Sequence, residues 1–172
     1  MTNYTGSIYE PGGRDACQTP PTALDPLLPY LPPDSILWEP ASGEGYLANR
    51  LRINNYEVIS TDILTGQNFF DYEPKSWDYL ITNPPFSIKH QWLERCYQLG
   101  KPFALLLPLS DLGLKGAQVH FKRYGVELII FDKRINFKMP NLGWGNEEKQ
   151  SNAHFATAWF TWGLGVRQQI TF

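Results

Sequence analysis

Three groups of residues that could take part in chemistry each follow a short apolar run of the chain. They are Glu39-Pro-Ala-Ser-Gly-Glu-Gly45, then Asp62, then Asn83-Pro-Pro-Phe86. Two glycines allow a tight turn and let a ligand approach the backbone closely. A carboxylate about 20 residues beyond such a turn can accept hydrogen bonds from both hydroxyls of a ribose. The first two groups therefore indicate a cofactor that contains a nucleoside.

The third group suits a planar amino group. Two consecutive prolines restrict the backbone and remove two N–H donors, and Asn83 is restricted because it precedes a proline. The Asn83 side-chain carbonyl and the Pro84 carbonyl could then accept both hydrogens of one NH2 group. Phe86 offers a flat face on which a base could stack.

Each group also has an ordinary interpretation. The glycines could form a plain strand-to-helix turn, Asp62 could cap a turn, and Asn-Pro-Pro could close a strand. The turn lacks the full G-x-G-x-x-G pattern, and Glu44 would repel a pyrophosphate, so NAD and FAD are disfavoured.

The elements that must position these residues alternate between strand and helix. Strands are expected over 35–39, 58–61, 77–82, 103–108, 126–131 and 153–162, with a brief one around Phe69-Phe70. Helices are expected over 45–53, 88–99 and about 114–124, and two short turns over 20–31. Such alternation predicts a parallel α/β sheet whose ligands bind at the carboxyl ends of its strands. The last two strands have no helix between them and should pair antiparallel.

Composition sets outer limits on function. The chain has 172 residues, 42% of them hydrophobic, and no apolar run long enough to span a membrane. Residues 1–13 hold no apolar run that could serve as a signal peptide. Cys17 and Cys96 form no disulfide framework, and the three histidines lie far apart, so we expect reduced thiols, no metal site and a cytoplasmic location. The net charge of −2 leaves the substrate open.

In this order and spacing, the three groups resemble the motifs of N6-adenine DNA methyltransferases, especially the small stand-alone ones that bacteriophages often encode. The resemblance spans roughly residues 17–162. It implies a Rossmann-like fold with a mostly parallel sheet of seven strands or slightly fewer and an antiparallel C-terminal strand. It implies S-adenosylmethionine as cofactor, S-adenosylhomocysteine as product and the host cytoplasm as location if the protein comes from a phage. We expect an arm over 1–18 and one methyltransferase domain over 19–172, without a separate target-recognition domain.

The resemblance also implies roles for single residues. Glu39 would lie near the amino group of the cofactor and Asp62 near its ribose. Asn68-Phe69 would lie near its adenine, although the family often has an acid at position 68, for which Asp71 is a rival. The implied cofactor-binding residues are Thr19, Pro20, Glu39, Pro40, Ala41, Ser42, Gly43, Gly45, Asp62, Asn68 and Phe69. The implied catalytic residues are Asn83, Pro84, Pro85 and Phe86, and Phe86 and Phe137 would border the target base.

The sequence leaves alternatives for the substrate. An RNA base and a protein glutamine amide also present a planar NH2 group, and a non-catalytic, cofactor-binding partner subunit is a third interpretation. DNA is the expected partner, and a second subunit or a homodimer stays open. A phosphate-binding face could come from the basic residues Lys89, Lys115, Lys122, Arg123, Lys133 and Arg134, and a loop contact with DNA from Lys138, Trp144 and Lys149.

Overall fold

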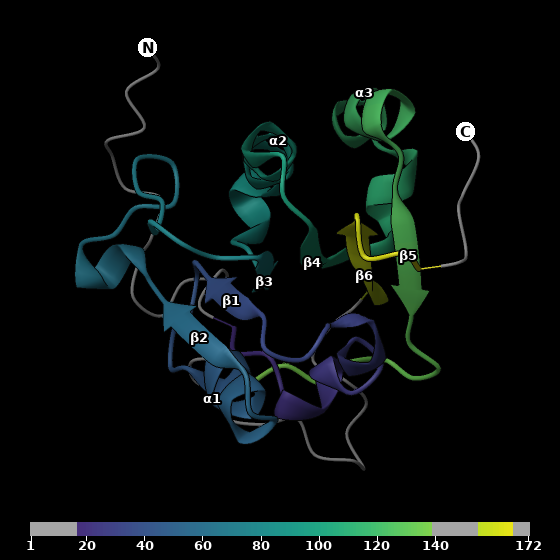
Figure 1. Ribbon diagram of the computed structural model, residues 1–172. Coiled ribbons are helices and arrows are strands. Elements are labelled where there is room, and N and C mark those ends of the chain that lie inside the picture. Colours follow the sequence, from purple (N-terminus) through teal and green to yellow (C-terminus); the bar gives the residue numbers. More distant parts are fainter. Residues whose placement is uncertain (1–16, 139–154, 167–172) are drawn as a thin grey trace.

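A six-stranded sheet forms the centre of the computed structural model, which describes residues 17–138 and 155–166 (Figure 1). The strand order is β2-β1-β3-β4-β6-β5. The strands are β1 (Ile36–Glu39), β2 (Glu57–Ser60), β3 (Tyr79–Thr82), β4 (Phe103–Pro108), β5 (Glu127–Ile130) and β6 (Thr157–Trp162). The helices are α1 (Tyr46–Ile53), α2 (Lys89–Leu99) and α3 (Lys115–Tyr124). Five 3-10 turns complete the set: η1 (Pro21–Leu24), η2 (Leu28–Tyr30), η3 (Ile63–Thr65), η4 (Phe86–Ile88) and η5 (Leu109–Gly113).

The sheet is parallel on one side and antiparallel on the other. β2, β1, β3 and β4 run parallel, whereas β6 pairs antiparallel with both β4 and β5, with Leu105 opposite Phe160. The mostly parallel sheet with an antiparallel C-terminal strand is thus confirmed. From β1 the chain crosses to β2, and from β3 it crosses the other way to β4, so the topological switch lies between β1 and β3.

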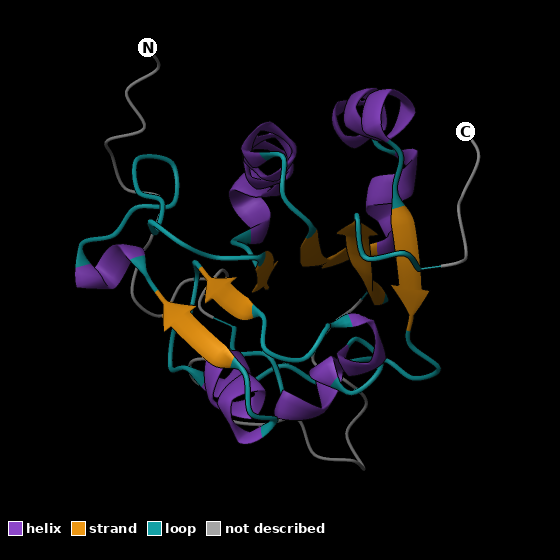
Figure 2. Ribbon diagram, in the orientation of Figure 1, coloured by secondary structure: helices purple, strands orange, loops and turns teal. Residues whose placement is uncertain are grey.

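Helices cover both faces of the sheet (Figure 2). On one face, α2 and α3 pack together and against the sheet through Trp92, Leu93 and Phe121. On the other, α1 and η1 contact each other, and Leu47 and Leu24 share a second core cluster. All of β4 is buried because its residues alternate between the two clusters. A strand whose sheet is covered by helices on both faces must be almost entirely apolar.

Two local predictions had opposite outcomes. The two short turns predicted over 20–31 are confirmed as η1 and η2. The strand expected around Phe69-Phe70 is wrong, because the chain turns there. The Asn68 side chain accepts a hydrogen bond from the Phe70 backbone N–H, and Asp71 and Tyr72 donate to the Asn68 carbonyl. An Asn that bonds the backbone two residues on favours a turn over a strand.

Candidate cofactor and amino-group site

A pocket lies at the carboxyl ends of β1, β2 and β3, where the switch in strand order places it. Many of the residues expected from the sequence line it. These are Thr19, Glu39, Pro40, Ala41, Ser42, Gly43, Asp62, Asn68, Phe69, Asn83 and Pro85. The expected residues Pro20, Gly45, Pro84, Phe86 and Phe137 do not line it. The lining residues not singled out from the sequence are Cys17, Gln18, Tyr46, Leu47, Ile63, Phe70, Ile88 and Trp92.

Glu39 links the first motif to the third. It is the last residue of β1, and its side chain is only 1% exposed. Thr82, the last residue of β3, donates a hydrogen bond of 2.7 Å from Oγ1 to Glu39 Oε1. Burial raises the pKa of the Glu39 carboxyl from 4.5 to about 7, although the hydrogen bonds from Thr82 and the Ala41 backbone oppose the shift. A buried carboxyl group that can still titrate near neutral pH therefore lies in this pocket.

The glycine turn is held in place by two side chains. Gly43 and Gly45 have φ of +50° and +84°, which L-residues rarely adopt. The Gly43 N–H donates to Asp62 Oδ2 at 2.9 Å, and the Glu44 N–H donates to Gln18 Oε1 at 3.0 Å. A β-carbon at position 43 would lie 2.7 Å from the Gln18 side chain. Conformation therefore favours glycine at position 43, and a larger residue would displace the Gln18 side chain.

Asp62 performs the ordinary role that the sequence left open. It caps η3, with Oδ1 accepting from the Leu64 N–H at 2.9 Å, while Oδ2 accepts from Gly43. Each carboxylate oxygen keeps a second lone pair, and Asp62 lines the pocket. A hydrogen bond from a ligand hydroxyl is therefore compatible with the cap, and the ribose contact stays a prediction.

Three pocket-lining side chains carry buried polar atoms with no hydrogen-bond partner among the described residues. They are Asn83 Oδ1, Thr19 Oγ1 and Trp92 Nε1. Buried polar atoms are nearly always hydrogen-bonded in folded proteins. Asn83 Oδ1 accepts, Trp92 Nε1 donates and Thr19 Oγ1 can do either, so a polar ligand in this pocket could partner all three.

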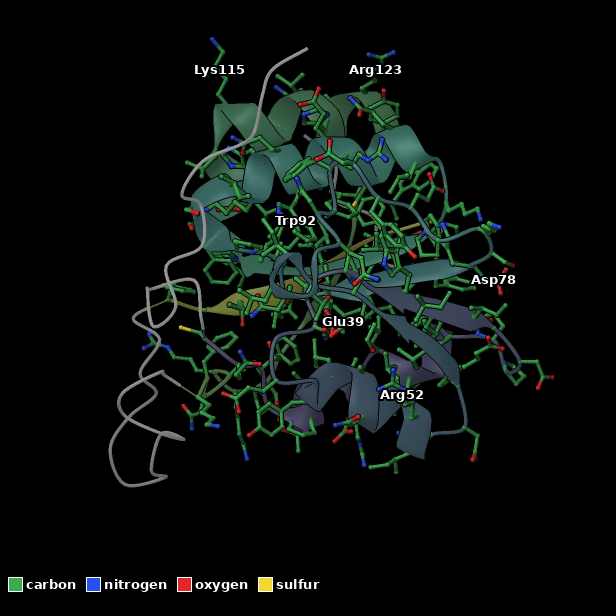
Figure 3. The ribbon with its side chains drawn as sticks, turned by 90° about the vertical axis from the view of Figure 1, so that its left-hand side faces the viewer. Glu39, Arg52, Asp78, Trp92, Lys115 and Arg123 are labelled. Atoms are coloured by element: carbon green, nitrogen blue, oxygen red, sulfur yellow. The ribbon has the colours of Figure 1, made fainter. Side chains whose placement is uncertain are left out.

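Asn68 and Phe69, the residues expected to bind the cofactor's adenine, both make contacts within the protein. Asn68 uses its amide within its own turn, donating to Asp71 Oδ2 at 2.8 Å and accepting from Phe70. Phe69 is buried, and its ring stacks on Trp92 with the centroids 4.1 Å apart. Figure 3 shows Trp92 between the helix layer and Glu39. Trp92, missed as a site residue, carried only the signal of an inward-facing position on a predicted helix.

The aromatic residues beside the pocket contact one another. Phe86 meets Phe155 edge-on at a centroid distance of 5.6 Å and Phe137 at 6.5 Å. Phe137 is buried, whereas Phe155 is 38% exposed. Phe86 is half-buried, so Phe155 is the most exposed of these three rings, and no sequence signal had singled it out.

Segments far apart in sequence are joined at the edge of the pocket. Gln18 and Lys138 exchange two backbone hydrogen bonds of 2.9 Å. Lys138 Nζ lies 2.7 Å from Glu44 Oε2 and 3.0 Å from the Tyr46 hydroxyl. Hydrogen bonding to Lys138 lowers the pKa of the Glu44 carboxyl. Lys138, one of the residues considered for a loop contact with DNA, is therefore bound to the glycine turn, while Trp144 and Lys149 lie outside the described residues.

Within residues 17–138 and 155–166, no cluster of three or more His, Cys, Asp or Glu side chains could hold a metal ion. None of the described helices has the length and apolar character needed to cross a bilayer.

Comparison with known proteins identifies the fold. Neither a protein-family model nor a curated protein sequence matches this chain. Among solved structures, a chain of the E. cuniculi Mtq2-Trm112 complex, responsible for methylation of the translation termination factor eRF1, is similar with a TM-score of 0.51 at 17% identity. That likeness covers 89% of this chain and 95% of the other. A dimethyladenosine transferase from Plasmodium falciparum is similar with a TM-score of 0.52 at 11% identity, covering 84% of this chain and 62% of the other. The chain therefore has the Rossmann-like methyltransferase fold.

Proposed function

We propose that this protein transfers a methyl group from S-adenosylmethionine to the N6 amino group of adenine in DNA. The observation that carries the proposal is Asn83 Oδ1, a buried acceptor that lines the pocket and has no partner among the described residues. Leaving such an atom unpaired costs about 1–3 kcal/mol. An amino group of the substrate would supply the missing donor.

The residues around Glu39 fit the amino-acid part of this cofactor. An α-amino group has a pKa near 8 and is largely cationic at neutral pH. A cation beside the buried Glu39 carboxyl would favour its ionised form and lower its raised pKa. Cofactor binding below about pH 7 should therefore release a proton from Glu39. The glycine turn contributes Ser42 and Gly43 to the pocket lining and is held there by Asp62 and Gln18.

When bound, S-adenosylmethionine supplies a methyl group on a positively charged sulfur, which is a strong donor. The task of the protein is then to orient a poor nucleophile, the amino nitrogen whose lone pair is delocalised into the ring. Asn83 Oδ1 in the pocket lining and the carbonyl of the next residue, Pro84, just outside that lining, would accept its two hydrogens. This favours negative charge and tetrahedral geometry at nitrogen. The same two bonds would hold the nitrogen in line with the methyl group.

The aromatic group favours a base over an aliphatic amide as the target. Phe86 directly follows the two prolines, and the partly exposed Phe155 ring lies against it. A base taken out of its stack regains stacking on such a surface. A glutamine side chain has no ring, so it would gain no stacking contact on these aromatic side chains.

The direct test is transfer of labelled methyl groups to three substrates: unmethylated duplex DNA, RNA and a protein extract. Nucleoside mass spectrometry should then find N6-methyladenine in the DNA. Label in RNA or in a protein amide instead would overturn the choice of substrate while keeping the reaction. Cofactor binding without transfer to any of the three would favour the non-catalytic partner role.

A further inference from the structure

The outer side of α3 carries a stripe of positive charge. Lys115, Lys122 and Arg123 are all exposed, and α3 contains no acidic residue. At 3.6 residues per turn, positions 115 and 122 lie on the same side of a helix and position 123 lies beside them. The opposite side buries Ala117 and Phe121 against the protein. Figure 3 shows Lys115 and Arg123 projecting away from the sheet at the two ends of the helix.

None of these three cations is among the basic side chains that the described residues hold in ion pairs. Three other basic side chains are held in ion pairs: Arg50 with Asp25 at 2.8 Å, Lys89 with Asp111 at 3.0 Å and Lys138 with Glu44 at 2.7 Å. Within residues 17–138 and 155–166, the α3 cations have no such partner. The whole chain has a net charge of −2, so this stripe is a local concentration of charge that the acidic residues do not neutralise.

The stripe begins close to the substrate side of the pocket. Gly116, in the first turn of α3, lies against the His90 ring, where an added β-carbon would come within 2.9 Å of Nδ1. His90 is in the first turn of α2, which follows the η4 turn that contains Phe86. From there the stripe follows α3 for about 12 Å, the rise of eight residues. It therefore leads outward from the aromatic group beside Asn83.

We propose that Lys115, Lys122 and Arg123 bind the phosphate backbone of DNA while a base occupies the pocket. This inference rests on the proposed function. A helix that exposes three cations without a carboxylate partner matches the charge of a sugar-phosphate strand, and phosphate contacts position a protein without reading sequence. Nucleic-acid binding then comes from a local face in a chain whose overall charge is negative.

The test is duplex DNA binding as a function of salt, measured by fluorescence anisotropy. The variants are Lys115→Gln, Lys122→Gln, Arg123→Gln and the triple variant, all at exposed positions. Lys75→Gln is the matched control, because Lys75 is exposed and precedes β3 at the opposite, amino edge of the sheet. Cofactor binding is measured in parallel by calorimetry as a check of folding.

Log K falls as log salt rises, and each lost phosphate contact should make this dependence less steep by about 0.9. The triple variant should make it less steep by about 2.7. At 0.1 M salt, that change corresponds to a loss of affinity of about 500-fold. Lys75→Gln should leave the slope unchanged, and every variant should keep its affinity for the cofactor.

Two results would overturn the inference in different ways. If the wild type binds DNA but the triple variant keeps its affinity and slope, α3 does not contact phosphate, and the proposed function survives. If the wild type fails to bind duplex DNA even at low salt, both proposals fail together. Salt-dependent binding through α3 without any methyl transfer would support the phosphate contacts alone and contradict the proposed function.

Discussion

Replacing Glu39 by Gln should stabilise the protein in the absence of cofactor, in a way that depends on pH. The folded protein holds the Glu39 proton up to about pH 7, whereas the unfolded chain loses it near pH 4.5. Between these values the folded state binds more protons, so its stability falls as pH rises and levels off above about pH 7. The raised pKa corresponds to about 3 kcal/mol of lost stability at pH 8.

Glutamine removes this cost without changing the shape of the side chain. Its carbonyl can accept from the Ala41 backbone, and its NH2 group can donate to the Thr82 hydroxyl, which serves as donor or acceptor. At pH 8, Glu39→Gln should therefore be up to about 3 kcal/mol more stable than the wild type, and the gain should shrink to nothing near pH 4.5.

Urea unfolding of both proteins without cofactor, at several values between pH 4.5 and pH 8.5, measures this difference. Glu44→Gln is the matched control, because Glu44 is exposed and its pKa is lowered by Lys138, so it should show no such gain. A difference between Glu39→Gln and the wild type that stays constant with pH would refute the reasoning. The same variant should lose affinity for S-adenosylmethionine, since a neutral amide cannot form an ion pair with the charged amino group of the cofactor.

Four further substitutions separate the roles of single residues. Gly43→Ala should weaken cofactor binding at least tenfold by calorimetry, because φ is +50° and a β-carbon would lie 2.7 Å from a neighbouring side chain. Gly66→Ala, with φ of +83° and open space, should cost stability but leave binding intact. Lys89→Met should cost about 3 kcal/mol in urea unfolding at pH 7, because Asp111 is fully buried, and the loss should shrink as acid protonates Asp111. Trp92→Phe should lower cofactor affinity about 3- to 10-fold, the worth of one N–H hydrogen bond, and unchanged affinity would show that the indole nitrogen meets no ligand.

Local pattern was enough to find the strands and their order of appearance. The unbroken apolar run of β4 predicts a strand covered on both faces, and its residues do alternate between two core clusters. The same reasoning failed at Phe69-Phe70, where two aromatic residues looked like a strand. The hydrogen bond from the Phe70 N–H to the Asn68 side chain, together with packing of Phe69 on Trp92, produces a buried turn instead.

From spacing alone the site was predictable where its residues follow strands, whereas Thr19, Asn68 and Phe69 came from the family resemblance. Glu39, Asp62 and Asn83 stand at strand ends and meet in one pocket for that reason. Thr82 looked like any strand residue, and its bond to Glu39 depends on β1 and β3 being neighbours in the sheet. The pairing of Gln18 with Lys138 joins segments 120 residues apart, and no local pattern encodes such a contact.

The central claim is that Asn83 binds the target amino group, and Asn83→Ala tests it most directly. Turnover of unmethylated duplex DNA and cofactor affinity should be measured on the same preparation. We predict that the rate constant for methyl transfer falls at least about 100-fold, the scale of one missing positioned polar group. Affinity for S-adenosylmethionine should stay within about threefold of the wild type. Turnover close to that of the wild type would contradict the account.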